Sequence, residues 1–457
     1  MKNTFNVLAL FLFGIVHAQI NLDSYQSAIA NQYNFGKAVA VFNNTVICAS
    51  GSPFLPTRGK LEIFNATDSG LTFVQTLQPT DGNDGDNYGY TLDMNDDYIA
   101  VGAPLYDSQF SNSGAVYVYK KTNGYWSLLQ KIVPIDGMSL ANFGYTVKIY
   151  EDQLFVCARY HSLFSNSSGK IYIYNLSQTT AELVQEWHIQ GRNGLANTLS
   201  LNLGKLVISY TQGATKYIET FSKTASSWIS EGRFALDAPD YYFRNLRLDG
   251  DHLYLQLSDD TDTETFIRVY KSINNNWEYE SEIELTKLNY SISDFEVSGN
   301  HMIIGYGFSS IGGKSPAAFY KKVNDAWVLQ EFLFGNADSS DSDSFGANIS
   351  FNNGKVYIGA PAEGATSAGK IYYSSDVLNS ENFDFNPGIF PNPTFGNLTI
   401  SDTPVKYAEI YNSIGQQVLQ QHIPLQEISL EGLENGLYII KLSDDHGRNK
   451  TYKIVKK

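Results

Sequence analysis

The chain has 457 residues and a formal net charge of −15 at pH 7. This length is sufficient for more than one hydrophobic core, and the acidic balance argues against nucleic acid or anionic lipid as the main partner. Aromatic residues make up 14% of the chain and charged residues 17%, with 31 tyrosines. Because aromatic residues suit pleated sheets better than helices, the composition predicts a nearly all-β protein.

The first segment is typical of an export signal. Lys2 precedes an apolar run from Val7 to Val16, which is too short to cross a bilayer as a helix. Val16-His17-Ala18 then fits cleavage after a small residue. Residues 1–19 are therefore predicted to be a signal peptide, and no later stretch is long and apolar enough to predict a transmembrane segment.

A repeat occupies most of the chain that follows. Each clear copy begins with Phe-Gly or Tyr-Gly, continues through two alternating runs joined by a short polar turn, and reaches a strand that ends in aromatic residues. The clear copies begin at Phe35, Tyr88, Phe143 and Phe345, and weaker copies begin at Asn197, Phe243 and Asp294. These seven copies are spaced by about 46 to 55 residues, a period that indicates a repeat architecture.

Each copy is predicted to contain four antiparallel strands, because residues alternate at period two between turn residues. In the second copy these strands are Gly89–Met94, Tyr98–Val101, Ala115–Tyr119 and Trp126–Val133. One such sheet cannot bury both faces alone, whereas seven sheets around an axis can. We therefore predict a seven-bladed β-propeller over residues 20–383. For the outer strand of the last blade we expect Ile20–Ala30, with Glu381–Phe385 as the alternative.

The chain contains two cysteines, Cys48 and Cys157, at equivalent positions in copies that are not neighbours. A disulfide requires Cα atoms within about 7 Å of each other. The sequence therefore predicts two buried, unpaired thiols, and two cysteines are too few for a zinc cluster.

The Phe-Gly pairs and the Val-Gly-Ala-Pro or Ile-Gly-Ala-Pro that follows them resemble FG-GAP repeats. The resemblance extends over about residues 34–373 and is most specific in the copies that begin at Tyr88 and Phe345. It implies a propeller like that in the head of integrin α chains. The residues agree with it, since glycine permits close backbone approach at a crowded inner strand and Pro104 and Pro361 end a strand where no ladder donor is needed.

The last 70 or so residues carry a second ordered set of motifs. It consists of Pro391-Asn392-Pro393, Ile414-Gly415-Gln416, Asn435-Gly436-Leu437-Tyr438 and a basic end with Lys453, Lys456 and Lys457. The set resembles the type A C-terminal sorting domain of type IX secretion cargo from Bacteroidetes.

The short alternating strands of this segment, separated by Gly and Asn turns, predict a small β-sandwich over residues 384–457. The resemblance implies passage through the periplasm, recognition by the type IX machinery, and attachment to the cell surface or release. The alternative is a small structural or ligand-binding β domain.

Calcium is the cofactor that the acidic segments of the chain could bind. Asp93–Asp97 lies where calcium-binding FG-GAP relatives have a longer acidic loop, but this connection is too short to wrap an ion, so we predict a hairpin turn. Better candidates lie in the connections that lead into the second and seventh copies: Asp81, Asn83, Asp84 and Asp86 in one, and Asp338, Asp341 and Asp343 in the other. Their oxygens could coordinate a hard cation. The same residues are also ordinary in solvated loops, and neither segment follows a full EF-hand pattern.

The long loops between the second and third strands share a face of the predicted propeller with the connections between copies. Tyr106, Phe110, Tyr160, His161 and Phe164 lie in these loops and could offer platforms to a glycan or a peptide. The alternative is that they fold back to cover the ends of the blades.

No catalytic motif stands out, since the scattered histidines lack a neighbouring nucleophile and no phosphate-binding glycine loop is present. The sequence therefore favours a surface or secreted binding and adhesion module for a glycan or a protein. A secreted polysaccharide-degrading enzyme, with carboxylates from different blades, and a purely structural surface module remain as alternatives.

Overall fold

The computed structural model describes residues 20–29, 33–52, 54, 58–67, 69–161, 169–188, 192–224, 227–238, 240–259, 264–285, 290–306, 308–309, 315–335, 343–352, 354–364, 367–374, 388–401, 405–412, 416–422, 427–443 and 449–457. Within these residues no helix is long and apolar enough to cross a bilayer. The predicted signal peptide, residues 1–19, lies outside the described residues, as does the expected domain boundary between residues 383 and 384.

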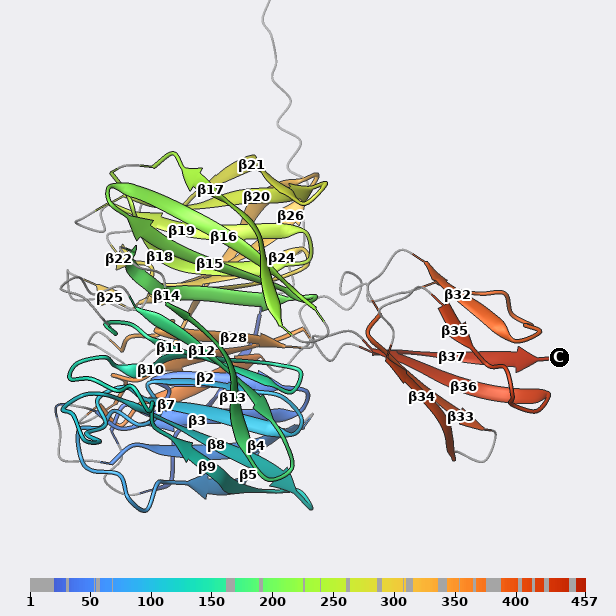
Figure 1. Cartoon of the computed structure of the whole chain (residues 1–457), viewed down its shortest axis with the longest axis horizontal. Coiled ribbons are helices and arrows are strands. Elements are labelled where there is room, and N and C mark those ends of the chain that lie inside the picture. The colour runs from blue at the N-terminus through green and yellow to red at the C-terminus, as the bar shows by residue number, and fades with distance from the viewer. Residues whose placement is uncertain are drawn as a thin grey trace, which may run out of the picture.

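The described residues between Leu22 and Ser374 form seven four-stranded antiparallel sheets, which are the blades of a β-propeller (Figure 1). The first three blades are β2 (Ala38–Phe42), β3 (Thr45–Ser50), β4 (Lys60–Thr67) and β5 (Gly70–Leu77); β6 (Thr91–Met94), β7 (Tyr98–Ala103), β8 (Ala115–Thr122) and β9 (Tyr125–Ile132); and β10 (Phe143–Tyr150), β11 (Gln153–Ala158), β12 (Lys170–Leu176) and β13 (Ala181–His188). The next two are β14 (Arg192–Asn202), β15 (Lys205–Gln212), β16 (Thr215–Lys223) and β17 (Trp228–Leu236); and β18 (Tyr242–Asp249), β19 (His252–Ser258), β20 (Thr265–Ile273) and β21 (Asn276–Glu284). The all-β propeller class expected from the repeat is confirmed.

The sixth blade is β23 (Asp294–Ser298), β24 (His301–Gly305), β26 (Pro316–Val323) and β27 (Ala326–Phe334). Its connections add a two-stranded ribbon of β22 (Tyr290–Ser291) and β25 (Phe308–Ser309). The seventh blade is β28 (Asn348–Asn352), β29 (Lys355–Ala360), β30 (Lys370–Ser374) and β1 (Leu22–Tyr25).

The N-terminal strand closes the ring. β1 pairs antiparallel with β30, with Leu22 opposite Ser374 and Tyr25 opposite Ile371. The ring of Tyr25 also lies 4.8 Å from that of Phe64 in the first blade, measured between centroids. The two ends of the repeat are therefore joined as we expected from Ile20–Ala30.

Contacts between glycines of neighbouring blades explain the repeat signature. A Cβ on Gly102 would lie 2.1 Å from the carbonyl oxygen of Gly144 in the next blade, and a Cβ on Gly359 would lie 2.0 Å from that of Gly36. Gly144 and Gly36 have φ angles of 86° and 94°, a region that favours glycine. The aromatic residues before these turns are buried between blades: Phe35, Tyr88, Phe143 and Phe345.

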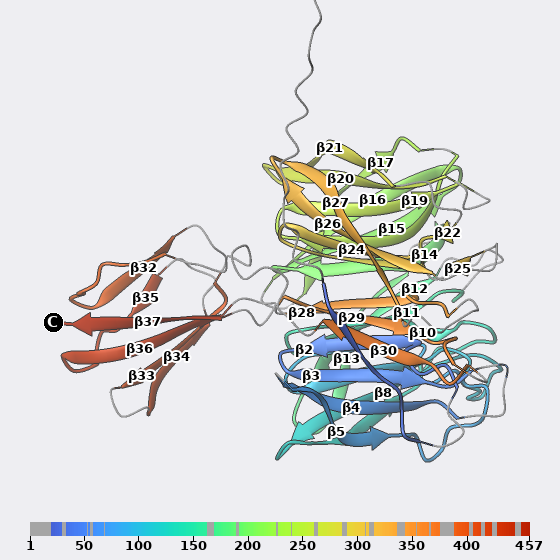
Figure 2. The same cartoon turned by 180° about the vertical axis from the view of Figure 1, so that it is seen from behind.

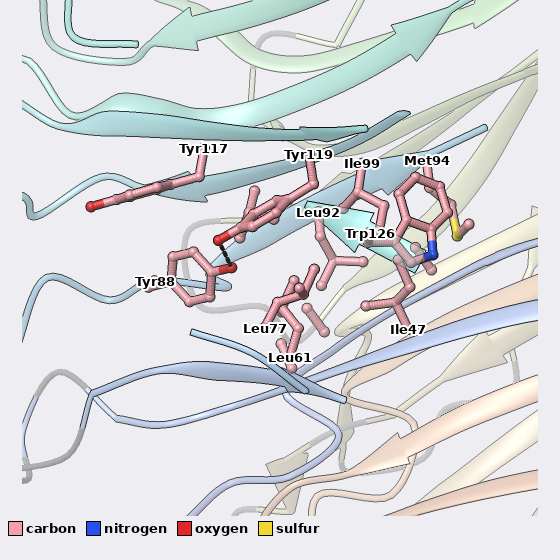
Figure 3. Close-up of a cluster of buried hydrophobic side chains, with 14 of the residues drawn as sticks. Ile47, Leu61, Leu77, Tyr88, Leu92, Met94, Ile99, Tyr117, Tyr119 and Trp126 are labelled. Atoms are coloured by element: carbon pink, nitrogen blue, oxygen red, sulfur yellow. Dashed lines mark hydrogen bonds between the residues drawn. The ribbon is translucent and has the colours of Figure 1, made fainter. Parts of the chain in front are cut away.

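Apolar side chains fill the space between adjacent blades. Figure 3 shows the core between the first and second blades, where Ile47 and Leu61 meet Ile99 and Trp126. Tyr88 donates a hydrogen bond of 2.9 Å to the Tyr119 hydroxyl within this core, so its polar atom is satisfied. Each fully buried large apolar side chain contributes roughly 1.5–3 kcal/mol, which makes blade-to-blade contact the main source of stability.

Both cysteines are free and fully buried. Cys48 lies on β3 and Cys157 on β11, in blades that are not adjacent. The predicted unpaired thiols are confirmed.

A small domain follows the propeller. One of its sheets consists of β31 (Gly388–Phe390), β32 (Asn397–Ser401) and β35 (Glu427–Ser429), and the other of β34 (Gln417–His422), β33 (Tyr407–Asn412), β36 (Gly436–Ser443) and β37 (Asn449–Lys456). Leu398 and Ile428 from the first sheet share one apolar core with Ile410 and Ile440 from the second. Both views place this domain on the side of the propeller opposite to β22 and β25 (Figures 1 and 2).

Candidate binding surface

The propeller has two faces with different connections. The short hairpins between the first and second strands of each blade form the turn face, to which the C-terminal domain is joined. The longer connections, among them the β22–β25 ribbon, lie on the opposite side, the loop face (Figure 2). Four of the predicted ligand-binding residues, Tyr106, Phe110, Tyr160 and His161, lie in connections on the loop face.

The structure exposes some of those predicted residues to solvent and packs others against the blades. Phe110 and Tyr160 are 44% and 42% exposed. Tyr106 folds back onto the second blade, where the Lys131 ammonium donates to its hydroxyl at 2.9 Å and lies 4.6 Å from its ring centroid. Phe164 lies outside the described residues.

His161 is fully buried rather than presented to solvent. Its Nε2 lies 3.2 Å from the backbone oxygen of Asp136 and 3.2 Å from that residue's carboxylate. Lys170 and Tyr172 donate to the same carboxylate at 2.6 and 2.8 Å. These contacts join the loop to the third blade, so this geometry gives His161 a structural role.

Tyr160 belongs to a cluster whose other members the sequence did not predict. It consists of Tyr90, Tyr145, Arg159 and Tyr160, and we call it the tyrosine–arginine cluster. Tyr90 and Tyr145 each follow the glycine of a Phe-Gly-type pair, in the second and third blades, and their ring centroids are 5.1 Å apart. Arg159 follows β11, and its guanidinium carbon lies 4.6 Å from the Tyr145 centroid and 5.0 Å from that of Tyr160.

The cluster places a half-buried guanidinium beside exposed tyrosine rings. Arg159 donates to the Tyr145 hydroxyl, and no carboxylate of the described residues forms an ion pair with it. Tyr90 is 39% exposed. Burial, together with the neighbouring Tyr145, raises the pKa of Tyr90 above its usual value, so its hydroxyl stays protonated at physiological pH.

Lys37 borders the cluster from the first blade. Its ammonium donates to the backbone oxygen of Tyr88 at 2.9 Å and to Asn87 at 3.3 Å. Its Cε lies within 3.6 Å of the place that a Cβ on Gly89 would take. Burial lowers the pKa of Lys37 to about 7.

The repeat alignment contains a signal that could have found this cluster. The residue after the Phe-Gly-type glycine is Lys37, Tyr90, Tyr145 or Ala347 in the four clear copies. Arg159 occupies the position that proline holds in the second and seventh copies. The residue type at these two positions differs between the copies, whereas the glycine after the first aromatic residue is the same in all four clear copies. Variation of this kind at a loop face indicates side chains that packing does not require.

Large apolar side chains are also exposed on this face. Phe54, Ile135 and Leu140 are exposed, and they lie in connections of the first three blades. Exposed large apolar side chains also lie on outer strands, for example Leu128 on β9 and Ile229 on β17, so the aromatic cluster, not apolar exposure by itself, distinguishes the loop face.

The acidic connection before the second blade is occupied by protein cations and backbone groups. Asp81 accepts from Lys131 at 2.5 Å and from Tyr117 at 3.2 Å. Asp84 lies 3.9 Å from Arg58, and the buried Asp86 accepts from the backbone N–H of Asn83 at 2.7 Å. In this segment the oxygens serve the protein's own donors.

In the corresponding connection before the seventh blade, Asp343 is buried and accepts from the backbone N–H of Phe345 at 3.1 Å. Asp338 and Asp341 lie outside the described residues. Within the described part of the chain, no group of three or more His, Cys, Asp or Glu side chains is placed to hold a metal ion.

The Asp93–Asp97 segment forms the predicted hairpin turn. Its side-chain anchor is Asn95, whose Oδ1 accepts from the backbone N–H groups of Asp97 at 3.0 Å and Tyr98 at 2.8 Å. The Asp93 carboxylate accepts from the backbone N–H of Ile149 in the next blade at 2.7 Å.

The turn face encloses a cavity of about 1250 Å³ between the propeller and the C-terminal domain. Some of its charges are paired: Arg247 lies 2.8 Å from both Asp294 and Glu296, and Lys148 lies 3.6 Å from Asp93. The lining also contains Asp96, Asp97 and Asp152, so carboxylates outnumber cations on this surface.

One ion pair joins the two domains across this cavity. Lys406 lies 3.1 Å from the Glu151 carboxylate and 4.4 Å from the Tyr150 ring centroid. Burial alone would raise the pKa of Glu151, but Lys223 and Lys406 outweigh it and hold that pKa below its usual value.

The structure brings the predicted sorting residues together around the terminal strand β37. Asn392 donates to the backbone oxygen of Lys453 at 2.8 Å and accepts from the N–H of Val455 at 3.0 Å. Pro391 and Pro393, on either side of Asn392, both follow cis peptide bonds. Lys457 donates its backbone N–H to Thr394 at 2.8 Å.

The other predicted sorting residues lie near the start of β36. Tyr438 is buried and donates to the backbone oxygen of Glu434 at 2.8 Å, and the Lys456 ammonium donates to Leu433. Asn435 and Gly436 are exposed at the entry to that strand, and Gly415 lies outside the described residues.

Comparison with known families and structures agrees with this architecture. The FG-GAP repeat family matches residues 71–119 and 126–174, and the secretion system C-terminal sorting domain family matches residues 388–457. No curated protein matches the chain in sequence.

Similar solved structures include three propeller-like chains. The β-propeller domain of Cps50 (Swd1) from Myceliophteria thermophila is 11% identical, with coverage of 78% of this chain and 100% of that one and a TM-score of 0.51. The WD40 domain of coronin from Toxoplasma gondii is 9% identical, with coverage of 80% and 89% and a TM-score of 0.51. A hypothetical selenium-binding protein from Sulfolobus tokodaii is 12% identical, with coverage of 92% and 96% and a TM-score of 0.51. At such identity the likeness concerns the fold alone. The chain is thus a β-propeller that carries FG-GAP repeats and ends in a type IX secretion sorting domain, which directs it to the cell surface or the extracellular space.

Proposed function

We propose that this exported propeller is a non-enzymatic binding or adhesion module, and that its loop face holds a glycan or a protein outside the cell. The observation that carries the proposal is the group of exposed side chains on that face, Tyr90, Phe110 and Tyr160. The Arg159 guanidinium lies against the rings of Tyr145 and Tyr160 in the same group. Tyrosine and arginine are enriched where proteins bind partners, because they give large contact area at low entropy cost.

The alternative of a polysaccharide-degrading enzyme has less support. A glycosidase needs two carboxyl groups that face the substrate, one of them able to deliver a proton. Of the carboxylates at the turn-side cavity, Glu296 accepts from Arg247, as does the neighbouring Asp294, and Asp93 accepts from the backbone N–H of Ile149. We therefore propose binding rather than hydrolysis.

The proposal is tested by binding of the full chain to a glycan array and to immobilised cell-surface proteins. A Tyr90→Ala/Tyr160→Ala double variant should lose about tenfold or more in affinity, since exposed aromatic anchors dominate such interfaces. Tyr125→Ala is the matched control, because Tyr125 is 66% exposed on the outer strand β9. Absence of binding to both ligand classes by the folded chain would contradict the proposal and favour a purely structural module.

A further inference from the structure

We propose that the tyrosine–arginine cluster is a subsite for an acidic sugar residue, in which Arg159 binds the carboxylate or sulfate and the tyrosine rings hold the sugar. This inference rests on the proposed function, because it names the class of ligand for the same face. Three features of the cluster lead to it.

The first feature is the open guanidinium of Arg159. A guanidinium has five N–H donors in a planar fork that matches a carboxylate or sulfate in two parallel hydrogen bonds. Within the described residues Arg159 has one hydrogen-bond acceptor, the Tyr145 hydroxyl, and two aromatic faces. Most of the fork is therefore available to a ligand that reaches this half-buried position.

The chain offers an internal standard for a saturated fork. Arg247 donates to Glu296 at 2.8 Å, to Asp294 at 2.8 Å and to Asn245 at 2.6 Å. At this position the protein supplies an acceptor for each nitrogen of the fork. The contrast indicates that Arg159 is not placed for internal pairing.

The second feature is the aromatic wall around Arg159. Tyr90 and Tyr145 pack at 5.1 Å between ring centroids, and Tyr160 covers the other side of the guanidinium. Aromatic rings present flat apolar faces with polar tips, which suits a pyranose with its C–H face and its hydroxyls. The backbone N–H of Tyr160 donates to Ala141 at 3.1 Å, which holds the backbone of Tyr160 before the ligand arrives and lowers the entropy cost of binding.

The third feature is the charge balance. The whole chain carries a net charge of −15, which repels a dense polyanion. The local cation is Arg159; Lys37 borders the site, but its Nζ donates to Tyr88 and Asn87 and burial lowers its pKa to about 7. The site therefore suits an oligosaccharide with one acidic group per sugar better than a densely sulfated chain, a nucleic acid or a membrane.

The test compares four probes by titration calorimetry with the full chain. They are a galacturonic acid oligomer, its carboxyl-reduced neutral counterpart, a singly sulfated galactose oligomer of the same length, and heparin. We expect the first, or the first and third, to bind, and the neutral and densely charged probes to bind at least tenfold more weakly. A difference between the first and third tells whether the acid is a carboxylate or a sulfate.

Two substitutions of Arg159 test whether this residue causes the preference for acidic oligomers. Arg159→Gln should lose about tenfold to one-hundredfold in affinity for the acidic oligomer, the effect typical of a hydrogen-bonded charge, whereas Arg159→Lys should retain part of it because the charge remains without the fork. Tyr125→Ala should bind as the wild type does. Circular dichroism melts establish that each variant is folded.

Two outcomes overturn the inference. If neutral and acidic oligomers bind equally well, or if Arg159→Gln leaves selectivity unchanged, the acidic subsite is wrong while the proposed binding function stands. If none of the oligosaccharides binds, the acidic subsite is also wrong, and the protein panel of the earlier test then decides the proposed function separately.

Discussion

The arginines at the two faces of the propeller have different surroundings. Arg247 on the turn side donates to two carboxylates and an amide. Arg159 on the loop side rests between tyrosine rings and donates to one hydroxyl. A repeat fold builds both faces from the same strands, so the difference indicates which face serves stability and which is available to a ligand.

The same contrast extends to the surfaces as a whole. The turn face meets the sorting domain through Lys406 and Glu151. The loop face exposes Phe110 and Tyr160 with no domain packed on them. We propose that the turn face is connected with export and folding and the loop face with recognition, and the following changes test this division.

Removal of residues 388–457 should have the largest effect. Because this segment matches the sorting domain family, the truncated chain should remain in the periplasm. Cell fractionation with antibody detection checks the location. The purified truncated chain should still bind the loop-side ligand, and normal delivery of the truncated chain to the medium would contradict the sorting assignment.

Arg247→Met should destabilise the propeller by about 3 kcal/mol, because it leaves Asp294 and Glu296 without their cation in a buried site. Arg159→Met should cost about 1 kcal/mol or less, since one hydrogen bond to the Tyr145 hydroxyl and contacts with tyrosine rings are lost. Denaturant unfolding measures both. Equal losses in the two variants would remove the distinction between the faces.

Acid should weaken the turn side through His301. This side chain is buried and its ring is stacked on Phe319 at 5.5 Å; burial, with a smaller effect of Lys321, lowers its pKa to about 4. A group whose folded-state pKa is depressed from 6.5 resists protonation, so stability is lost as pH falls from about 6.5 to 4. The wild type should lose about 3 kcal/mol relative to His301→Phe over this range.

Unfolding free energies of both proteins at several pH values check this prediction. The His301→Phe variant is the control for all other acid-sensitive groups, since it retains them. If the unfolding free energies of the two proteins fell in parallel with pH, the low pKa of His301 would be contradicted. Affinity of the loop face should change in the same way in both proteins.

The contact between the domains should have a smaller effect. A double-mutant cycle of Lys406→Gln and Glu151→Gln should give a coupling free energy of about 1 kcal/mol or less, as partly exposed ion pairs do. Lys441→Gln, which affects a pair with Glu409 inside the sorting domain, is the control and should show no coupling with Glu151. Zero coupling between Lys406 and Glu151 would show that this contact does not hold the domains together.

Calcium should have the smallest effect. Asp81, Asp84 and Asp86 are engaged by protein donors, so about 1 mM calcium, enough to fill extracellular calcium modules, should leave the Tm unchanged. A thermal melt with calcium and with a chelator checks this. A calcium-dependent rise in Tm would restore these residues as a metal site.

The sequence predicts the strands well because their period-two pattern is local. In the second blade the predicted Tyr98–Val101 and Trp126–Val133 are observed as Tyr98–Ala103 and Tyr125–Ile132. The glycine signature is also local in its cause, since it reflects a positive φ and a close approach at each turn.

The sequence predicted the face of the candidate site and two of its residues, Phe110 and Tyr160, but not Tyr90, Tyr145 or Arg159. The burial of His161 depends on Asp136, which precedes it by 25 residues, and the cluster joins Tyr90 to Tyr145 across two blades. Such pairings are set by how blades pack and leave no periodic mark in the chain. A repeat alignment that searches for departures at loop positions would have selected Tyr90 and Arg159.

The most direct test of the division between faces is hydrogen exchange of the full chain with and without a bound acidic oligosaccharide, followed by mass spectrometry. The account predicts slower exchange in residues 88–91, 143–146 and 159–161, around the tyrosine–arginine cluster. Residues 93–98 and 150–153, in the hairpins of the turn face, should be unchanged. Protection confined to those hairpins would contradict the account.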